Sequence, residues 1–350
     1  MNKWELLSVL KERAAGDPND PNNSADSNKY IAGDEISKIF GVKRASVWRS
    51  VNELKKLGYE IESRINCGYK IIAAEGRDVI NDYEILSRLR GKGLSNYDVV
   101  FKKSTDSTNS DAKKHDGENI ALIVAGEQTA GKGRYGRNFI SPESKGVYMT
   151  IKINRGNISL NIDDITFYPL IAAAAVGRAV SSICGGIEPL IKWPNDLLCE
   201  TGGGYKKICG ILTEASVETQ SRSVSYVIVG IGLNVNNEPA DFPADIKDTA
   251  SSLKIISGRH YSRADIIGET VYYFTAFMNM PRDKLLDEYR KRLMLGIDIS
   301  FAENGRLFKG VAKGINENGN LIAELENGHE TTVQSGEINF IQQRQLRQMR

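Results

Sequence analysis

A glycine-rich segment interrupted by cations is the part of the sequence best suited to chemistry. Residues 126–137 read Gly-Glu-Gln-Thr-Ala-Gly-Lys-Gly-Arg-Tyr-Gly-Arg. Glycines let main-chain N–H groups approach a ligand closely, and Arg134 and Arg137 can each bind a phosphate or carboxylate through two hydrogen bonds. Together with Lys132, they predict a loop that closes over a negatively charged substrate. The alternative is an ordinary basic surface loop, which would not need glycines at this spacing.

Two familiar phosphate-binding motifs match this segment only in part. Residues 126–132 begin like a P-loop, but Gly133 stands where that motif needs a Ser or Thr hydroxyl for Mg²⁺. Residues 131–136 fit the dinucleotide fingerprint, yet residues 138–142, Asn-Phe-Ile-Ser-Pro, do not continue into a helix. We also expect no parallel βαβ unit around the segment. The sequence therefore predicts neither a P-loop nor a dinucleotide site.

Polar groups also stand at the ends of apolar stretches. Lys192 ends a strand, and the turn at Pro194 would present this cation on a rigid element. Residues 229–236, Val-Gly-Ile-Gly-Leu-Asn-Val-Asn, combine a strand with two glycines, as expected where a flat ring or a phosphate lies against bare backbone. Residues 106–109, Asp-Ser-Thr-Asn, precede a helix that begins near Ser110. They could face a ligand, although capping of that helix explains the Ser and Thr equally well.

The first 75 residues have the order of a winged helix-turn-helix. We expect helices over 33–40 and 43–57, with Asp34 near the first N-cap, and a β-hairpin over 59–72. A further short helix opens the chain, and residues 14–29 are rich in Gly, Asp, Pro, Asn and Ser, which predicts a loop. The side chains expected on the inner faces are apolar and recur at helical spacing: Trp4, Leu6, Leu7, Leu10, Ile36, Ile39, Phe40, Val47, Val51 and Leu54.

Charge decides where nucleic acid could bind. The chain of 350 residues has 46 basic and 44 acidic side chains, a net charge of +2 that excludes a uniformly basic, histone-like binder. Residues 43–56, however, hold five Lys or Arg against Glu53, which predicts a DNA-binding face. The alternative is the solvated face of a protein-interaction module. The residues expected to contact bases or phosphates are Lys43, Arg44, Ser46, Arg49, Asn52 and, on the hairpin, Arg64.

The rest of the chain reads as two more domains. Residues 83–294 alternate strands and helices irregularly, which predicts an α+β domain with a mixed or mainly antiparallel sheet. Residues 295–350 contain short strands and Asn-Gly turns at 304–305, 318–319 and 327–328, typical of a small β-barrel or sandwich. We place a linker at 76–82, after a first domain at 1–75. The other elements expected are strands at 99–102, 120–125, 147–153, 190–193, 208–212 and 226–233, and helices at 83–89, 169–183 and 263–278.

Several classes of protein are not expected. The longest nearly apolar stretch, 170–180, is about half of what a bilayer span needs, and the N-terminus lacks the apolar region of a secretory signal. We therefore expect a cytoplasmic protein without a membrane segment. The four cysteines form no C-x-x-C pair and there are only three histidines, so we predict neither a disulfide framework nor a zinc site.

Taken together, these segments resemble the biotin protein ligases, in the bifunctional form that is also the biotin operon repressor. The resemblance covers nearly the whole chain and rests on the helix-turn-helix and on motifs at 106–109, 128–137, 192–196, 207–214 and 230–236. It implies an α+β multidomain fold: a winged helix-turn-helix, a class II synthetase-like ligase domain and a C-terminal SH3-like β-barrel.

The resemblance also implies an activity and partners. Biotin and MgATP would give biotinyl-5′-AMP and pyrophosphate, and a lysine of the biotin carboxyl carrier protein of acetyl-CoA carboxylase would then take the biotinyl group. A homodimer formed on adenylate binding would bind double-stranded operator DNA and repress biotin genes. If the adenylate orders loops at the dimer surface, linkage makes the liganded protein the better dimer.

Site residues follow from the family's motifs. Lys192 and Arg134 are the expected catalytic cations, because biotin's carboxylate must approach the α-phosphate of ATP and the two anions repel. We assign no protein ligand to Mg²⁺, which would sit mainly on phosphate oxygens. The implied biotin contacts are Ser107, Thr108, Asn109, Gln128, Lys132, Gly133, Arg134, Lys192 and Gly210. The implied ATP contacts are Arg134, Arg137, Phe139, Lys192 and Asn234.

The sequence departs from the family at some positions. Lys132 stands where the family usually has Arg, which removes a bidentate contact to the adenylate, and Phe139 stands where many members have Trp. The loop at 14–29 is also longer than the family's equivalent. Three rival functions stay open here: a biotin-sensing transcription factor with a degenerate ligase site, a lipoate or octanoate protein ligase on a related fold, and a biotin ligase without repressor function.

Overall fold

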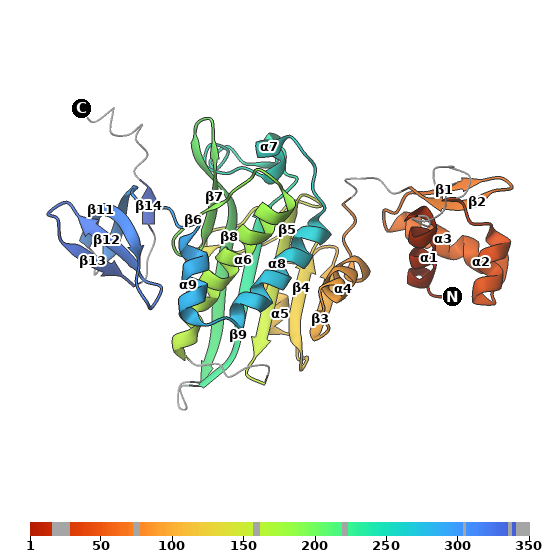
Figure 1. The fold of residues 1–350 in the computed structure, drawn as a ribbon, viewed down its shortest axis with the longest axis horizontal. Helices are drawn as coiled ribbons and strands as arrows, with labels where there is room; N and C mark the ends of the chain where they lie inside the picture. Colours follow the sequence, from red (N-terminus) through yellow and green to blue (C-terminus); the bar gives the residue numbers. More distant parts are fainter. Residues whose placement is uncertain are drawn as a thin grey trace. The chain divides into compact units, whose positions relative to one another are not determined.

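The computed structural model describes residues 1–15, 29–72, 78–156, 162–218, 223–303, 306–334 and 338–340. Most of the predicted loop at 14–29, the Asn-Gly turn at 304–305 and the first part of the predicted linker lie outside these residues. The chain divides into two compact units, Met1–Val79 and Ile80–Arg350, which we describe separately (Figure 1).

The N-terminal unit contains the predicted helix pair and hairpin. Its elements are α1 (Lys3–Ala15), α2 (Gly33–Phe40), α3 (Arg44–Lys56), β1 (Ile61–Arg64) and β2 (Gly68–Ile71). The two strands pair antiparallel, with Ile61 opposite Ile71. The core is made by apolar side chains at helical spacing, as predicted: Leu6, Leu7, Leu10, Ile36, Val47, Val51 and Leu54.

Asp34 lies near the N-cap of α2, as predicted: the N-cap position is Ala32, which makes no side-chain capping bond, and Asp34 follows in the first turn. Its carboxylate binds the guanidinium of Arg44 on α3 through Nε and Nη2. One expectation for α2 is wrong. Ile39 does not join Ile36 in the core, because its side chain is 53% exposed. A helix of eight residues makes only about two turns, and Ile36 is the residue of α2 that is buried.

The larger unit is built on a seven-stranded mixed sheet. Its strand order is β3-β4-β5-β9-β8-β7-β6, with β3 and β4 parallel and every other neighbouring pair antiparallel. The strands are β3 (Tyr97–Lys102), β4 (Ile120–Ala125), β5 (Gly146–Asn154), β6 (Leu190–Lys192), β7 (Asp196–Thr201), β8 (Gly204–Glu218) and β9 (Ser223–Asn234). The mixed sheet is the one that the sequence predicts.

One topological expectation fails here. We expected no parallel βαβ unit beside the glycine-rich segment, but β3, α5 (Thr108–Lys113) and β4 form one. The glycine-rich segment follows this unit, and the chain then enters the antiparallel β5. Because the segment opens no α-helix, the dinucleotide fingerprint still lacks its structural context.

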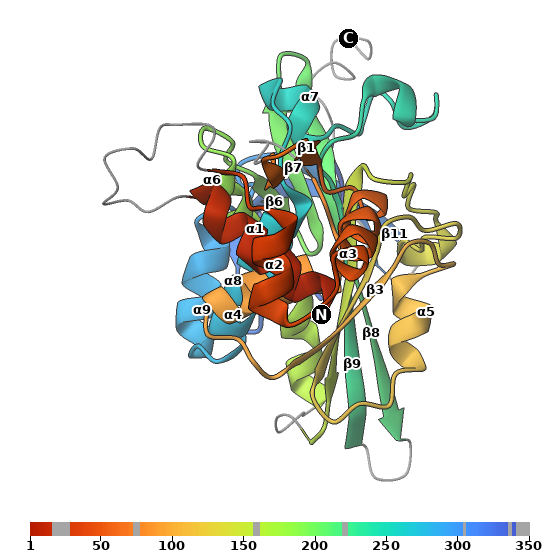
Figure 2. The ribbon, with the colours of Figure 1, turned by 90° about the vertical axis from the view of Figure 1, so that its right-hand side faces the viewer.

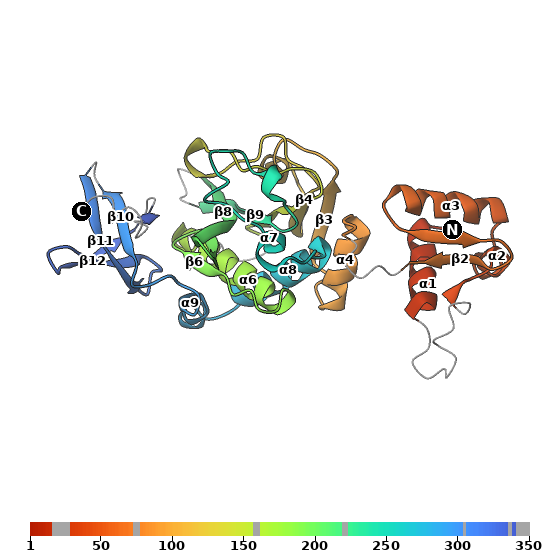
Figure 3. The ribbon, with the colours of Figure 1, turned by 90° about the horizontal axis from the view of Figure 1, so that it is seen from above.

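Helices cover both faces of the sheet. The long helices α6 (Tyr168–Ile183) and α8 (Arg263–Met278) lie together on one face, flanked by α4 (Asp82–Gly91) and α9 (Arg282–Arg290) (Figures 1 and 3). The helix α5 packs on the other face, against β4, β5 and β9 (Figure 2). The smaller α7 (Leu253–Ser257) and 3-10 turns at Arg134–Gly136, Ile162–Phe167 and Pro239–Asp241 complete the described helical segments.

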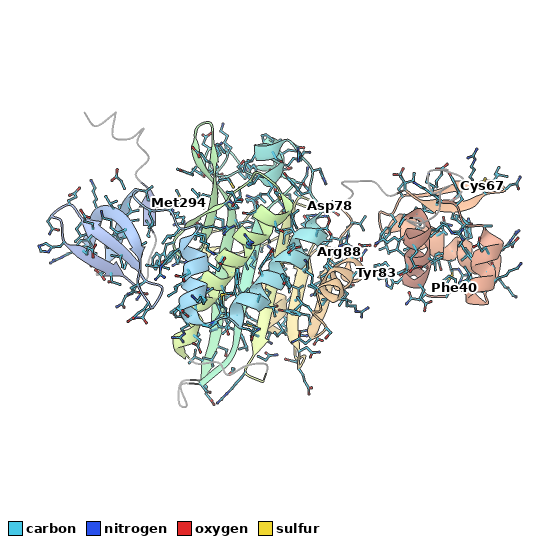
Figure 4. All side chains as sticks on the ribbon, in the orientation of Figure 1. Phe40, Cys67, Asp78, Tyr83, Arg88 and Met294 are labelled. Atoms are coloured by element: carbon cyan, nitrogen blue, oxygen red, sulfur yellow. The ribbon has the colours of Figure 1, made fainter. Side chains whose placement is uncertain are left out.

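The strands divide their side chains between these two layers. In β4, Leu122 and Val124 join the main core, whereas Ala121 and Ile123 join a smaller cluster beneath α5. This alternation is the two-residue period of a strand that is buried on both faces. Arg88, labelled in Figure 4, joins α4 to α8, because its Nε donates to Asp265 Oδ1 at 2.8 Å.

The C-terminal strands form a second, antiparallel sheet. Its order is β13-β12-β11-β10-β14, for β10 (Asp298–Glu303), β11 (Arg306–Ile315), β12 (Leu321–Leu325), β13 (Glu330–Val333) and β14 (Ile338–Phe340). Its inward residues, such as Phe301 and Leu321, belong to the same apolar core as the central sheet. The predicted turns at 318–319 and 327–328 are present, with glycine φ angles of 76° and 80°.

One apolar stretch is longer than the sequence suggested. Residues Asp164–Ile183 are long and apolar enough to cross a membrane by length and composition alone. In the structure, 67% of the most apolar window of this stretch is buried, because α6 packs against α8 and the central sheet. The stretch is therefore a core helix of this fold.

Phe274 in α8 tests the packing between the helices and the sheet. Its side chain is fully buried, so Phe274→Ala should lower the free energy of unfolding by about 3–5 kcal/mol, measured by urea denaturation with circular dichroism. Tyr272→Ala on the same helix is the control, because this side chain is 39% exposed and should cost about 1 kcal/mol or less. Equal losses in both variants would contradict the described core.

Candidate functional site

A cavity of about 490 Å³ opens between the glycine-rich segment and the strands β8 and β9. It brings together segments that are far apart in the sequence, which include the loop after β4, the start of α5 and the turn after β6. All of the residues predicted for biotin and ATP line it: Ser107, Thr108, Asn109, Gln128, Lys132, Gly133, Arg134, Arg137, Phe139, Lys192, Gly210 and Asn234.

The glycine-rich segment folds back on itself before the chain enters β5. Gln128 pairs with Ser141 and Lys132 with Asn138 in isolated bridges, so the two limbs of the loop run side by side. Gly136, with φ of 73°, adopts the left-handed conformation that favours glycine. The loop is therefore held by pairing within itself, and it places Lys132 and Arg134 at the cavity.

The floor of the cavity is bare backbone. Gly210 on β8 lies opposite Gly232 on β9, and the ring of Phe139 rests on this pair. A Cβ added at Gly232 would stand 2.5 Å from Phe139 Cε1, which no real side chain tolerates. The sequence predicts that a flat ring lies against this strand, and the ring found there is the protein's own Phe139.

The two expected catalytic cations reach the cavity from different segments. Lys192 is the last residue of β6 and is followed by the turn Trp-Pro-Asn, which leads into β7. Asn195 in this turn donates from Nδ2 to the carbonyl of Ile211 at 2.8 Å, and its Oδ1 accepts from Arg134 Nη1 at 2.9 Å. The turn thus connects Lys192, Arg134 and β8.

An ion pair at the cavity was not predicted from the sequence. Lys207 on β8 binds Asp196 on β7, with Nζ 2.8 Å from Oδ1, and both residues line the cavity. Asp196 directly follows the predicted turn and Lys207 lies two residues before Cys209, so both stand inside the motifs already noted. Their charge type was the available signal, but the antiparallel pairing of β7 and β8 is what brings them together.

The Asp-Ser-Thr-Asn segment is used differently from a simple cap. Ser107 occupies the N-cap position of α5, but its side chain makes no capping bond, so the capping interpretation is wrong. Thr108 donates from N and from Oγ1 to Gln128 Oε1, at 2.9 and 3.1 Å. Asn109 Nδ2 donates to Glu214 Oε2 at 2.7 Å. These polar groups therefore organise the wall of the cavity.

Asn234 ends β9 with its amide already anchored. Its Nδ2 donates to the carbonyl of Ser251 at 3.0 Å, and the side chain is 6% exposed. This bond fixes the orientation of the amide at the cavity wall.

Metal-ligating and thiol side chains are not grouped at this site. Within the described part of the chain, no cluster of three or more His, Cys, Asp or Glu could hold a metal ion. The cysteines of this unit are buried and unpaired, and burial raises the pKa of the Cys184 and Cys199 thiols to about 12. Such thiols stay protonated and unreactive at neutral pH.

The predicted nucleic-acid face lies on α3 and the hairpin of the N-terminal unit. Lys43, Arg49 and Arg64 are exposed, whereas Ser46 and Asn52 are half-buried. Arg44 is also exposed, but the Asp34 carboxylate already binds it and raises the pKa of its guanidinium.

Trp48 was not singled out from the sequence, although it lies on α3 with a 63% exposed side chain. The helical spacing could have identified it. Trp48 comes four residues after Arg44, so it lies on the same face as this exposed arginine and not on the face of the buried Val47, Val51 and Leu54.

Three family models match separate segments of the chain. Residues 99–234 match the Biotin/lipoate A/B protein ligase family, residues 25–70 match an HTH domain, and residues 295–340 match the Biotin protein ligase C terminal domain.

Individual proteins agree with these matches. The chain is 35% identical over 313 residues to the Bifunctional ligase/repressor BirA of Bacillus subtilis, covering 86% of this chain and 91% of that protein. It is 26% identical over 256 residues to the Biotin--[acetyl-CoA-carboxylase] ligase of Mycobacterium tuberculosis, covering 71% and 90%. The solved Biotin protein ligase from Aquifex aeolicus in complex with biotin and ATP is 25% identical with a TM-score of 0.57, covering 69% and 98%. The chain therefore belongs to the biotin/lipoate A/B protein ligase family and is similar over most of its length to the family's bifunctional ligase/repressors.

Proposed function

We propose that this chain is a biotin protein ligase that also represses biotin genes. It would activate biotin with MgATP to biotinyl-5′-AMP and then pass the biotinyl group to a lysine of the biotin carboxyl carrier protein of acetyl-CoA carboxylase. The observation that supports this most strongly is the cavity itself, because Arg134 and Lys192 both line it above the Gly210–Gly232 floor.

The first half-reaction needs fixed positive charge. A carboxylate oxygen of biotin attacks the α-phosphorus of ATP, and pyrophosphate leaves with the electrons of the broken P–O bond. Arg134, held by Asn195, and Lys192, at the end of β6, would stabilise the negative charge that develops. Because both cations are already fixed by the protein before the reaction, they stabilise the developing negative charge without any rearrangement of solvent or side chains.

The second half-reaction needs no covalent enzyme intermediate. The amine of the acceptor lysine attacks the acyl carbon of biotinyl-5′-AMP, a C–N bond forms, and AMP leaves as the C–O bond breaks. This agrees with buried cysteines whose burial raises their thiol pKa values. The protein's part is to hold the mixed anhydride and admit the acceptor.

The cavity wall divides into two sides in this proposal. Biotin would contact the α5 side and the loop, through Ser107, Thr108, Asn109, Gln128, Lys132, Gly133, Arg134, Lys192 and Gly210. ATP would contact Arg134, Arg137, Phe139, Lys192 and Asn234. Mg²⁺ would enter bound to the phosphates of the nucleotide. The described residues contain no cluster of three or more metal-ligating side chains.

The N-terminal unit would give the repressor function. We infer that β1 and β2 are the wing of a winged helix-turn-helix and that α3 reads the major groove of operator DNA. Adenylate binding would favour a homodimer that places two such units on two half-sites. We also propose domain limits at 1–75, 83–294 and 295–350, a class II synthetase-like central domain, an SH3-like form for the last domain and a cytoplasmic location.

Lys192 tests the ligase claim. The protein, incubated with biotin, MgATP and carrier domain, should label the carrier on a streptavidin blot, and Lys192→Ala should lower the rate by about 100-fold or more with an unchanged unfolding curve. Lys206→Ala is the matched control, because this β8 lysine does not line the cavity. An unlabelled carrier would contradict the ligase function, and full turnover by Lys192→Ala would remove this residue from the reaction. Competition between biotin and lipoate in the same carrier assay distinguishes a biotin ligase from the rival lipoate ligase.

Arg49 tests the repressor claim. In a gel-shift titration with DNA from upstream of biotin genes, Arg49→Ala should weaken binding and reduce the slope of log affinity against log salt by about 1 if it contacts one phosphate. Arg13→Ala on α1 is the control, since this arginine pairs with Glu35. Unchanged affinity in Arg49→Ala would show that this face of α3 is not the DNA-binding surface.

A further inference from the structure

Thr150 is a buried hydroxyl residue that the proposed reaction does not use. It lies in the middle of β5, it is fully buried, and it is not among the residues that line the cavity. Its neighbours across the sheet are Ile123 on β4 and Gly230 on β9. A hydroxyl buried in a sheet needs hydrogen-bond partners, and the identity of these partners connects Thr150 to the cavity.

Thr150 is the centre of a chain of hydrogen bonds that links β5 to α5, to the glycine-rich loop and to β8. Its Oγ1 is 2.7 Å from Asn109 Oδ1 and 2.7 Å from Thr108 Oγ1. Thr108 in turn contacts Gln128 Oε1 through both N and Oγ1. Gln128 Nε2 donates to Ser141 Oγ at 2.9 Å. One buried hydroxyl thus touches two cavity residues directly and a third through one intermediate.

The other end of the chain reaches an ion pair. Asn109 Nδ2 donates to Glu214 Oε2 at 2.7 Å, and Lys113 Nζ lies 2.6 Å from Glu214 Oε1. Burial opposes the charge on Glu214, but the bonds from Lys113 and Asn109 outweigh it and lower its pKa. The carboxylate fixes which end of the Asn109 amide is the donor, so Asn109 Oδ1 must face Thr150 as an acceptor.

A glycine provides the space for this arrangement. Gly230 lies opposite Thr150 on β9, and a Cβ built there would be 2.3 Å from Asn109 Oδ1. The amide of Asn109 therefore fills the position that a side chain at Gly230 would occupy. Since Asn109 and Thr108 begin α5, the bonds of Thr150 determine where the start of this helix stands on the sheet.

We propose that Thr150 is a positioning residue for biotin binding. Its hydroxyl would hold Thr108 and Asn109, and through Thr108 also Gln128, in the arrangement that binds biotin. The proposal rests on the proposed ligase function. It separates the two substrates, because the residues assigned to ATP are not direct partners of Thr150.

Thr150→Val is the variant that tests this, because valine keeps the shape and removes the hydroxyl. Asn109 Oδ1 would lose its donor while 5% exposed, and Thr108 Oγ1, 3% exposed, would keep only Gln128 Oε1 as its partner. The KM for biotin, and its Kd by calorimetry, should rise by about 10-fold, as expected for a buried polar group left unpaired. The KM for ATP should stay within about twofold, because Arg137, Phe139 and Asn234, which are assigned to ATP alone, are not direct partners of Thr150.

Matched variants separate positioning from general damage. Thr150→Ser restores the hydroxyl and should return the biotin KM to within about threefold of the unmodified protein. Thr270→Val removes a buried hydroxyl in α8 that has no hydrogen-bond partner among the described residues, and should leave both KM values unchanged. Glu214→Gln, at a half-buried site, alters the far end of the chain and should raise the biotin KM by about threefold.

The outcomes distinguish the positioning role of Thr150 from the ligase function on which it rests. An unmodified protein that neither binds nor ligates biotin would refute the ligase function and this role together. An active unmodified protein with normal biotin KM in Thr150→Val and Glu214→Gln would overturn the positioning role alone. Equal rises in biotin and ATP KM in Thr150→Val would also overturn it, since they would show a general loosening of the sheet.

Discussion

The contact between the Phe139 ring and the paired glycines of β8 and β9 is the constraint on which the site depends. A loop can lie flat on a sheet only where the sheet has no side chains, and Gly210 faces Gly232 at that point. A Cβ at Gly232 would overlap the ring, and one at Gly210 would come within 3.0 Å of Lys207 Nζ. The glycines thus make the surface against which the glycine-rich loop folds.

This contact explains why cations from distant segments can share one cavity. With Phe139 seated on the floor, the loop that carries Arg134 comes within hydrogen-bond distance of Asn195 in the turn after Lys192. The same turn is held from outside the cavity, because Trp193 Nε1 donates to the carbonyl of Gly319 next to β12 at 2.8 Å. Backbone, loop and C-terminal sheet together fix the positive charge that opposed anions require.

Local pattern predicted much of this, and long-range pairing supplied the rest. The strand 120–125 and the helix 263–278 have the predicted bounds, because their periodicity or unbroken apolar run is local. Local pattern does not predict α9 or β14, and β8 is longer than predicted, since the stability of these elements comes from packing on other elements. The network of Asn109, Thr150 and Glu214 joins residues on three elements, and only the strand register brings them together. The motifs located the cavity residues, but not the bonds between them.

The most direct test of the central claim is biotin-dependent exchange of labelled pyrophosphate into ATP, measured without any carrier protein. This exchange reports only the joining of biotin's carboxylate to the α-phosphate, which is the step that Arg134 and Lys192 are proposed to promote in one cavity. The account predicts label in ATP when biotin and MgATP are present and none when biotin is omitted. Biotin binding without any exchange would contradict it and would make the protein a biotin sensor with an inactive ligase site.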